Sequence, residues 1–183
     1  ESTHEAIVID PSWDLEKLTE IINEQNLNPK YIINTHWHDD HTRGNEDLAK
    51  ELSVKIVQHS ASQLKNDLTV SDGDSIKFGC SELAVYHTPG HSKDSICLVG
   101  DGKIFSGDTL FVGNCGRIDL PGGSAKELYH GLFDVIANLS DDLVLYPGHD
   151  YGSSSTSTIG KEKQTNPVMQ KMSENEFVER MGG

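Results

Sequence analysis

The sequence has few basic residues and no long hydrophobic run, and both absences limit what the protein can bind. Its 183 residues include 15 Lys and Arg against 29 Asp and Glu, which gives a net charge of −14. Proteins that bind nucleic acid neutralise phosphates with Lys and Arg, so we expect no nucleic-acid partner. A membrane span needs about 18 consecutive apolar residues, and no apolar run approaches that length. We therefore expect no membrane partner either.

Cysteine is also scarce. The three cysteines, Cys80, Cys97 and Cys115, are odd in number and show no close pairing, which disfavours a disulfide framework and indicates a reducing compartment. We expect a cytoplasmic protein, since the chain also opens without the basic start of a signal peptide. A length of 183 residues suits one domain, so we assign residues 1–183 to a single domain. The sequence predicts no particular oligomeric state.

Apolar patterning predicts a succession of short strands and amphipathic helices. Apolar runs bounded by Gly, Pro or Asp predict strands at residues 6–10, 31–34, 55–58, 75–78, 82–87, 95–99, 103–107 and 143–146. Helical spacing and capping residues predict helices from residue 15 to near 28, at 45–52, shortly after 58, at 124–139 and after Ser173. This order fits sheets covered by helices on the outside. Because a two-sheet sandwich needs its edges completed, we expect one or more strands upstream of residue 6.

The stretch at residues 35–44, THWHDDHTRG, crowds three histidines and two aspartates into six positions. It leaves the C-terminal end of a predicted strand, where ligand-binding groups of layered α/β proteins usually lie. Imidazole and carboxylate together suit zinc and iron, so the stretch is a candidate metal site. A solvated polar loop is the alternative that this stretch alone leaves open.

Three later loops that leave predicted strands each present a ligand-type side chain after a glycine. TPGH ends in His91, SGD in Asp108 and YPGH in His149. Each alone is more often a hydrogen-bonded or solvated residue, but strand ends far apart in sequence can converge in space. The combined candidate donors are His36, His38, Asp40, His41, His91, Asp108 and His149. Seven donors exceed the needs of one tetrahedral ion and suit two ions that share a carboxylate and keep positions open for catalysis.

These motifs resemble those of a known family. THWHDDH resembles the HxHxDH signature of the metallo-β-lactamase superfamily, and TPGH, SGDTLF and YPGHDYG resemble its later metal-ligand loops in the same order. The resemblance implies an α+β fold, a four-layer αββα sandwich with the metals at one edge between the sheets. The implied ligands are His36, His38 and His91 for the first ion, Asp40, His41 and His149 for the second, and Asp108 as the bridge. Asp39 matches a variable position and is expected to face solvent.

Within the superfamily, FSGDTLFVGNCGRIDLPGG resembles the hydroxyacylglutathione hydrolases, or glyoxalase II enzymes, which cleave small-molecule thioesters. The resemblance implies two divalent ions, zinc first with iron or manganese as options, that hold a bridging hydroxide by lowering the pKa of water to about 7. Asp40 would act in catalysis as a ligand that also orients this hydroxide. Arg117 would bind a substrate carboxylate or only pin its loop to an acidic neighbour. Tyr151 would touch the substrate or pack under the loop.

CGRID, YPGHDYG and ENEFVERM are also similar to the persulfide dioxygenases of the same superfamily. That resemblance implies one Fe(II) on His36, His91 and Asp108, the two-histidine, one-carboxylate set of oxygen-activating iron, and a thiol-derived substrate, glutathione persulfide. Residue 119 is Asp where the hydrolases tend to place an aromatic residue, and only 34 residues follow His149, which leaves glutathione thioester specificity open. We expect a thioester hydrolase, with the dioxygenase as the alternative. A β-lactamase, a nuclease and a non-enzymatic metal-binding module fit the motifs less well.

Overall fold

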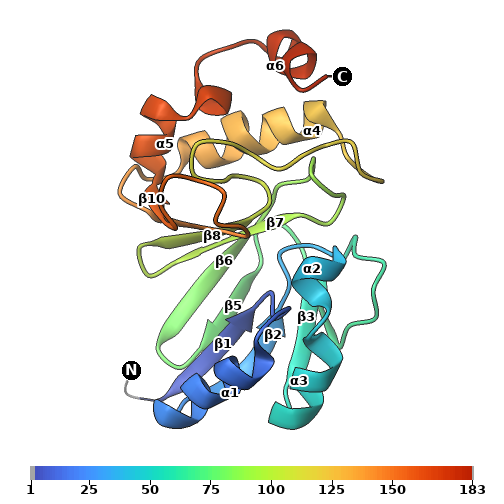
Figure 1. Cartoon of the computed structure of the whole chain (residues 1–183), viewed down its shortest axis with the longest axis vertical. Coiled ribbons are helices and arrows are strands. Elements are labelled where there is room, and N and C mark those ends of the chain that lie inside the picture. The colour runs from blue at the N-terminus through green and yellow to red at the C-terminus, as the bar shows by residue number, and fades with distance from the viewer. Residues whose placement is uncertain (1–2, 183) are drawn as a thin grey trace.

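Two β-sheets form the centre of the molecule, and helices cover their outer faces (Figure 1). The structure is a computed structural model that describes residues 3–182. The first sheet has four parallel strands in spatial order, β1 Glu5–Ile9, β2 Asn28–Ile33, β3 Lys55–His59 and β4 Leu68–Val70. The second has six, in the order β10-β9-β8-β7-β6-β5. Their bounds are β5 Ser75–Phe78, β6 Ser81–His87, β7 Ile96–Gly100, β8 Lys103–Gly107, β9 Val144–Pro147 and β10 Ser157–Thr158.

Six α-helices lie outside the sheets in the described residues. They are α1 Leu15–Glu24, α2 Asp39–Thr42, α3 Asn45–Leu52, α4 Ala125–His130, α5 Ile159–Thr165 and α6 Glu174–Arg180. Figure 1 shows α1, α2 and α3 beside the first sheet, while α4, α5 and α6 lie beyond the second sheet. None of the helices in residues 3–182 has the length and apolar character that crossing a bilayer requires.

Three separate buried clusters correspond to the three interfaces of a four-layer sandwich. One cluster joins the two sheets and includes Ile33 of β2 and Leu98 of β7. A second packs α1 and α3 onto the outer face of the first sheet, through residues such as Leu48. The third packs the C-terminal helices onto the second sheet, with Leu128 and Leu145 at its centre. The predicted α+β fold, an αββα sandwich, is therefore confirmed, while the assignment of the whole chain to one domain stays a prediction.

The local sequence explains why the first sheet is parallel. Ile32 and Ile33 at the end of β2 are both fully buried, one in the helix-facing cluster and one in the inter-sheet cluster. Strands that are buried on both faces read as continuous apolar runs and are connected by crossover helices, here α1 and then α2 with α3. Because the strands run in one direction, their C-terminal ends and the loops that follow lie at the same edge of the sheet.

The short helix predicted after residue 58 is wrong. Residues 60–67 form irregular turns and lead into β4, which pairs with β3. The carboxylate of Asp67 accepts the backbone N–H of Ile56 at 2.9 Å and fixes the chain beside the sheet just before β4. Pairing with the sheet edge therefore overrides the local apolar spacing.

The helix predicted at residues 124–139 is three shorter pieces. After α4 the chain continues as a π-helical turn, Gly131–Val135, and a 3₁₀ turn, Ile136–Asn138. The predicted apolar face is confirmed, since Leu128 and Leu132 are fully buried. Helix α5 and strand β10, both near the C-terminus, were not predicted from the sequence.

The predicted helix-capping motifs differ in completeness. The Ser124 hydroxyl accepts the N–H of Glu127 at 3.3 Å, but the Glu127 carboxylate binds Lys93 instead of returning to Ser124. Ser173 and Glu176 form both halves of a capping box at the start of α6. The terminal helix predicted after Ser173 is thus confirmed.

Candidate metal centre

All seven predicted donors lie together at the edge of the sandwich where β2, β6, β8 and β9 end. His36 and His38 follow β2, and Asp40 and His41 lie on the short helix α2. The other three donors lie in the loops that follow β6, β8 and β9. Contacts between their donor atoms link the seven residues into one cluster. Their roles as ligands remain predictions, but the geometry places every one of them in the same site.

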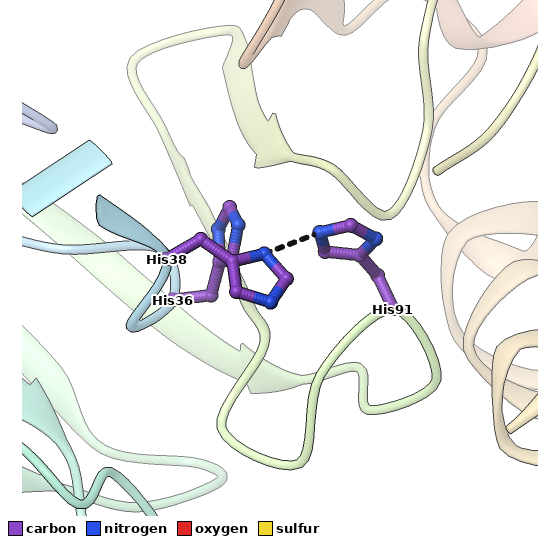
Figure 2. A group of neighbouring side chains, drawn as sticks. All are labelled: His36, His38 and His91. Carbon is purple, nitrogen blue, oxygen red and sulfur yellow. Dashed lines mark hydrogen bonds between the residues drawn. The ribbon is translucent and has the colours of Figure 1, made fainter. Parts of the chain in front are cut away.

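The first predicted ligand set is a group of three imidazoles contributed by both sheets. Figure 2 shows His36 and His38 side by side after β2, with His91 approaching from the second sheet. His38 Nδ1 and His91 Nε2 lie 2.8 Å apart, and one nitrogen from each of the three rings lies within 4.8 Å of the others. His91 Nδ1 donates to the carbonyl oxygen of Arg117 at 2.7 Å. Because that nitrogen carries the proton, His91 Nε2 keeps its lone pair for a metal.

The second predicted set, Asp40, His41 and His149, also brings its donor atoms together. His41 Nε2 lies 3.2 Å from His149 Nε2, and His149 Nε2 lies 3.4 Å from Asp40 Oδ2. His41 Nδ1 donates to the carboxylate of Asp10 at 2.9 Å. This bond fixes the tautomer of His41 so that Nε2 faces the cluster as a lone pair.

Asp108 lies between the two sets. Its Oδ2 is 3.4 Å from His91 Nε2 in the first set and 3.4 Å from His149 Nε2 in the second. Its Oδ1 is 3.4 Å from His41 Nε2. Two ligands of one tetrahedral ion, each about 2.0–2.1 Å from the metal, are about 3.3 Å apart. The position of Asp108 is therefore suitable for a ligand shared by both sets.

Three buried polar atoms in this cluster lack a hydrogen-bond partner. They are His36 Nε2, His38 Nε2 and Asp108 Oδ1. Among residues 3–182, no other buried side-chain nitrogen or oxygen atom lacks a partner. Buried polar groups are normally paired, so each exception needs a physical explanation. Unpaired nitrogen and carboxylate donors gathered in one site fit a metal of the zinc or iron type.

Burial favours the neutral form of two histidines of the first set, His36 and His38. It lowers the pKa of His36 well below its ordinary value, and the neighbouring histidines lower it further. Burial also lowers the pKa of His38, helped by His91. Because a metal binds only the neutral imidazole, this environment favours metal over proton at the first set.

The second set and the shared carboxylate carry more charge. The hydrogen bond to Asp108 raises the pKa of His149. Burial lowers the pKa of His41, but the hydrogen bond to Asp10 and the surrounding carboxylates outweigh it, so the pKa of His41 is raised. Burial raises the pKa of Asp108, but the hydrogen bond with His149 and the nearby histidines bring it below its ordinary value. The carboxylate of Asp108 is therefore ionised at neutral pH and available as an anionic donor.

The glycine before each of two donors is required by space. Gly107 has a φ of 49°, and a Cβ there would collide with the side chain of Thr35. A Cβ on Gly148 would collide with Asp108 Oδ1 and lie 2.8 Å from His41 Cε1. The SGD and PGH motifs are thus needed because the backbone itself forms part of the cluster wall.

Asp10 is a functional residue that the sequence interpretation missed. It follows β1, and its carboxylate accepts the N–H of Thr35 at 2.7 Å, the Thr35 hydroxyl at 2.6 Å and His41 Nδ1. It therefore joins the end of β1 to the loop that carries the donors. The sequence carried no glycine before Asp10 and the predicted strand at residues 6–10 included it, so the signal that pointed to Asp108 was absent here.

An open cavity of about 660 Å³ lies over the cluster. Its wall includes His91, Asp108 and the loop that ends in Arg117. The Arg117 guanidinium pairs with the carboxylate of Asp119 at 2.5 Å and holds the pKa of that carboxyl at about 2. The contact with an acidic neighbour, which was one of the two expectations for Arg117, is thus present. A substrate-binding role for Arg117 stays a prediction.

Tyr151 and Asp39 also line this cavity. Tyr151 is 72% exposed and stacks flat on the ring of His149, with centroids 4.7 Å apart. It lies over a predicted ligand on the cavity side, where a substrate would pass. Asp39 is exposed, as expected, and pairs with Arg43 instead of joining the donor cluster.

A sandwich of two sheets with histidine and aspartate donors clustered at one edge defines a class of metal-dependent enzymes. Residues 1–64 and 58–149 match the family described as the Metallo-beta-lactamase superfamily. The chain belongs to this superfamily, and the resemblance inferred from its motifs is confirmed.

Individual relatives represent both branches that the motifs suggested. The chain is 36% identical over 184 residues to the mitochondrial persulfide dioxygenase ETHE1 of Homo sapiens, a match that covers 98% of this chain and 72% of the relative. It is 38% identical over 153 residues to the hydroxyacylglutathione hydrolase of Tolumonas auensis, with 81% of this chain and 58% of the relative covered.

Solved structures match the chain as well. The crystal structure of ETHE1 from Myxococcus xanthus matches with a TM-score of 0.95 and 32% identity, covering 100% of this chain and 82% of that one. The crystal structure of TTHA1623 in a di-iron-bound form matches with a TM-score of 0.75 and 29% identity, covering 87% of each chain. The fold is therefore shared with proteins that bear different names within one superfamily.

Proposed function

We propose that the protein is a non-haem iron dioxygenase that oxidises a persulfide of a small thiol such as glutathione. The observation that carries the proposal is the similarity to a persulfide dioxygenase along 98% of the chain. The similarity to a hydroxyacylglutathione hydrolase is no weaker in identity but covers 81% of the chain. The proposal reverses the order of the two expectations drawn from the motifs, in which the hydrolase came first.

The proposed iron ligands are His36, His91 and Asp108. Two neutral histidines and one carboxylate are the donor set of iron enzymes that activate oxygen, and Fe(II) bound there would supply that chemistry. Burial holds His36 neutral, the carbonyl of Arg117 fixes the tautomer of His91, and His149 helps to hold Asp108 ionised. The chain thus favours the neutral form of His36 and the ionised form of Asp108, and it orients His91 with Nε2 toward the site.

The cavity residues are proposed to bind the thiol portion of the substrate. Arg117 lies at the cavity wall with an exposed guanidinium, which suits a substrate carboxylate once its bond to Asp119 opens. Tyr151 offers a flat exposed ring beside His149 for the body of the ligand. A low-molecular-weight sulfur compound as the partner and a cytoplasmic location are kept as parts of this proposal.

Thioester hydrolysis is the second candidate, and one specific observation favours it. A second donor set is available in Asp40, His41 and His149. His149 Nε2 lies 3.4 Å from the carboxylates of both Asp40 and Asp108, and His41 Nε2 lies 3.4 Å from the carboxylate of Asp108. A second ion bound there would lower the pKa of water and supply a hydroxide nucleophile. Asp40, whose carboxylate reaches His149 from a half-exposed position, would be the ligand that also orients this hydroxide.

Metal counting combined with two assays decides between the candidates. The protein is loaded anaerobically with Fe(II) or with Zn(II), its metal content is measured, and oxygen uptake with glutathione persulfide is compared with cleavage of a hydroxyacylglutathione thioester. One iron with persulfide-dependent oxygen uptake supports the proposal. Two equivalents of metal with thioester cleavage and no oxygen uptake would overturn it in favour of the second candidate.

A matched pair of variants tests the ligand assignment in the same assays. Asp108→Asn removes the shared carboxylate and is expected to abolish metal retention. Asp39→Asn changes an exposed carboxylate that pairs with Arg43 instead of joining the donor cluster, and it should leave the metal content unchanged. Equal metal content in both variants would contradict the assigned site.

A further inference from the structure

A buried carboxylate lies outside the predicted ligand set. Glu162 on α5 is only 1% exposed, and no cation neutralises it among the salt bridges of residues 3–182. Instead it accepts three hydrogen bonds, from the N–H of Gly113 at 2.8 Å, the side-chain amide of Asn166 at 2.9 Å and the hydroxyl of Ser157 at 2.5 Å. Burying a carboxylate is costly unless such bonds replace water. These three bonds offset that cost and tie α5 to the segment that contains Gly113.

Asn166, just after α5, completes the same network. It is fully buried, and its side-chain amide donates to the carbonyl oxygens of Phe111 and Asn114, each at 3.2 Å. Those two residues are the ends of a tight turn that is closed by the Phe111 N–H bonding to the Asn114 carbonyl at 2.8 Å. Glu162 and Asn166 therefore hold the middle and both ends of the turn formed by residues 111–114.

This turn forms part of the wall of the substrate cavity. The Phe111 ring meets the edge of His149 at 5.9 Å and that of Tyr151 at 5.5 Å between centroids. A little further along the chain, the N–H of Gly116 donates to the carbonyl oxygen of Asp108 at 2.9 Å. The turn thus lies between the shared carboxylate and the loop that carries Arg117, and it touches the rings over the cluster.

We propose that Glu162 and Asn166 are positioning residues for substrate binding. They contact neither a predicted ligand nor the cavity, and they act by fixing the turn at residues 111–114 against α5. The fixed turn sets the place of Phe111 against Tyr151 and hence the width of the cavity. The identity of the substrate rests on the proposed function, whereas the role of the network does not.

Two substitutions of Glu162 distinguish the loss of its hydrogen bonds from the loss of its charge. In Glu162→Ala the Gly113 N–H and the Ser157 hydroxyl lose their acceptor, and the turn is released from α5. In Glu162→Gln a single amide oxygen can accept from both Gly113 and Asn166, as Oε2 does now, while the amide nitrogen faces the Ser157 hydroxyl, which can accept. The glutamine variant is therefore expected to keep the turn in place.

Thr158→Ala is the matched control on the same helix. The Thr158 hydroxyl caps α5 by accepting the N–H of Lys161 at 3.2 Å, and it has no bond to the turn. Its loss is expected to lower the thermal midpoint without altering the cavity. A variant that acts only through helix stability should behave like this control.

Amide exchange and substrate kinetics test the proposal together. Glu162→Ala is expected to speed amide exchange at Gly113 about tenfold and to raise KM about tenfold with little change in kcat, because a buried donor loses its partner and binding weakens without loss of chemistry. Glu162→Gln and Thr158→Ala should retain the wild-type KM and Gly113 exchange rate. If Glu162→Ala is recovered unfolded, Asn166→Ala serves instead and is expected to give the same two changes.

Two outcomes would overturn the proposal. One is wild-type KM and Gly113 exchange in the alanine variants, and the other is a loss of thermal midpoint in Glu162→Ala with KM unchanged, as in the Thr158 control. If the wild-type protein turns over neither persulfide nor thioester, the proposed function fails. Gly113 exchange and calorimetric binding of glutathione still decide the role of Glu162 in that case, since neither readout needs turnover.

Discussion

Asp10→Asn is expected to weaken the second metal set selectively. Asp10 Oδ1 accepts the backbone N–H of Thr35. A backbone N–H can only donate, so in the asparagine variant the side-chain amide oxygen must occupy the position of Oδ1. The amide nitrogen then replaces Oδ2, which now accepts from the Thr35 hydroxyl at 2.6 Å and from His41 Nδ1 at 2.9 Å. A hydroxyl can reverse its role, but His41 Nδ1 would have to become an acceptor. Its proton would move to Nε2, the atom that faces the donor cluster.

The expected magnitude follows from the loss of this orienting bond. Replacing the partner of a metal-binding histidine costs about 10- to 100-fold in metal affinity, which corresponds to about 1.4–2.7 kcal/mol. The assay is competition between the protein and a chromogenic chelator for Zn(II), which counts the equivalents bound and gives an affinity for each. We expect the larger loss at the second equivalent, because Asp10 bonds His41 directly, whereas in the first set it reaches His36 only through the Thr35 hydroxyl, which lies 3.1 Å from His36 Nδ1.

Asp39→Asn provides the control, because Asp39 is an exposed carboxylate one residue from the same cluster and bonds only Arg43 among the contacts of its side chain. Unchanged affinity for both equivalents in Asp10→Asn would refute the assignment of His41 Nε2 as a donor. Loss of the first equivalent instead of the second would refute the division of the donors into two sets.

Three further predictions use simpler changes. Gly148→Ala should lose most bound metal in elemental analysis, because the added methyl collides with the shared carboxylate. Arg117→Ala should raise KM for a substrate with a carboxylate about tenfold or more, with kcat nearly unchanged. Arg117→Lys should not restore the wild-type KM, because lysine lacks the planar guanidinium that binds a carboxylate through two hydrogen bonds. Equal KM values in the wild type and both variants would contradict this role. In alkylation at pH 8 followed by mass spectrometry, the exposed Cys80 should react in the folded protein, while Cys97 and Cys115 should react only in denaturant. Burial raises the pKa of these two thiols to about 11 and about 12, so the reactive thiolate is scarce at pH 8 and would increase only as the pH rises toward those values.

The donors could be predicted because each signal is local. A strand followed by glycine and then His or Asp places a side chain at a sheet edge, and several such signals imply convergence. Asp10 was missed because its importance depends on a bond to His41, 31 residues away. Glu162 was missed for a similar reason, since a glutamate in a polar segment is normally exposed. Its burial depends on the turn near Gly113, 49 residues earlier in the chain.

The layers of the fold were predictable from apolar runs, but its edges were not. Strand β4 has three residues and two of them are exposed, so no apolar run announces it. It forms because it pairs with the edge of the neighbouring strand β3. The apolar pattern of residues 68–70 alone does not reveal this pairing. The same holds for β10, whose two residues, Ser157 and Thr158, pair with β9.

The two candidate functions differ in how many donor sets hold metal, and the environment of each set bears on that difference. In the first set the side chain of His91 is 3% exposed, and burial lowers the pKa of His36 and of the half-buried His38. The second set combines the buried His41, whose side chain is 2% exposed, with the more open His149 at 21% and Asp40 at 48%, and the pKa of both histidines is raised. A raised pKa means that a proton competes better with metal there. We therefore expect metal to be lost from the second set before the first as the pH falls. This asymmetry favours a single ion on the side of the first set, where Asp108 lies 3.4 Å from His91 Nε2 and can complete the His36, His91 and Asp108 set of the dioxygenase proposal.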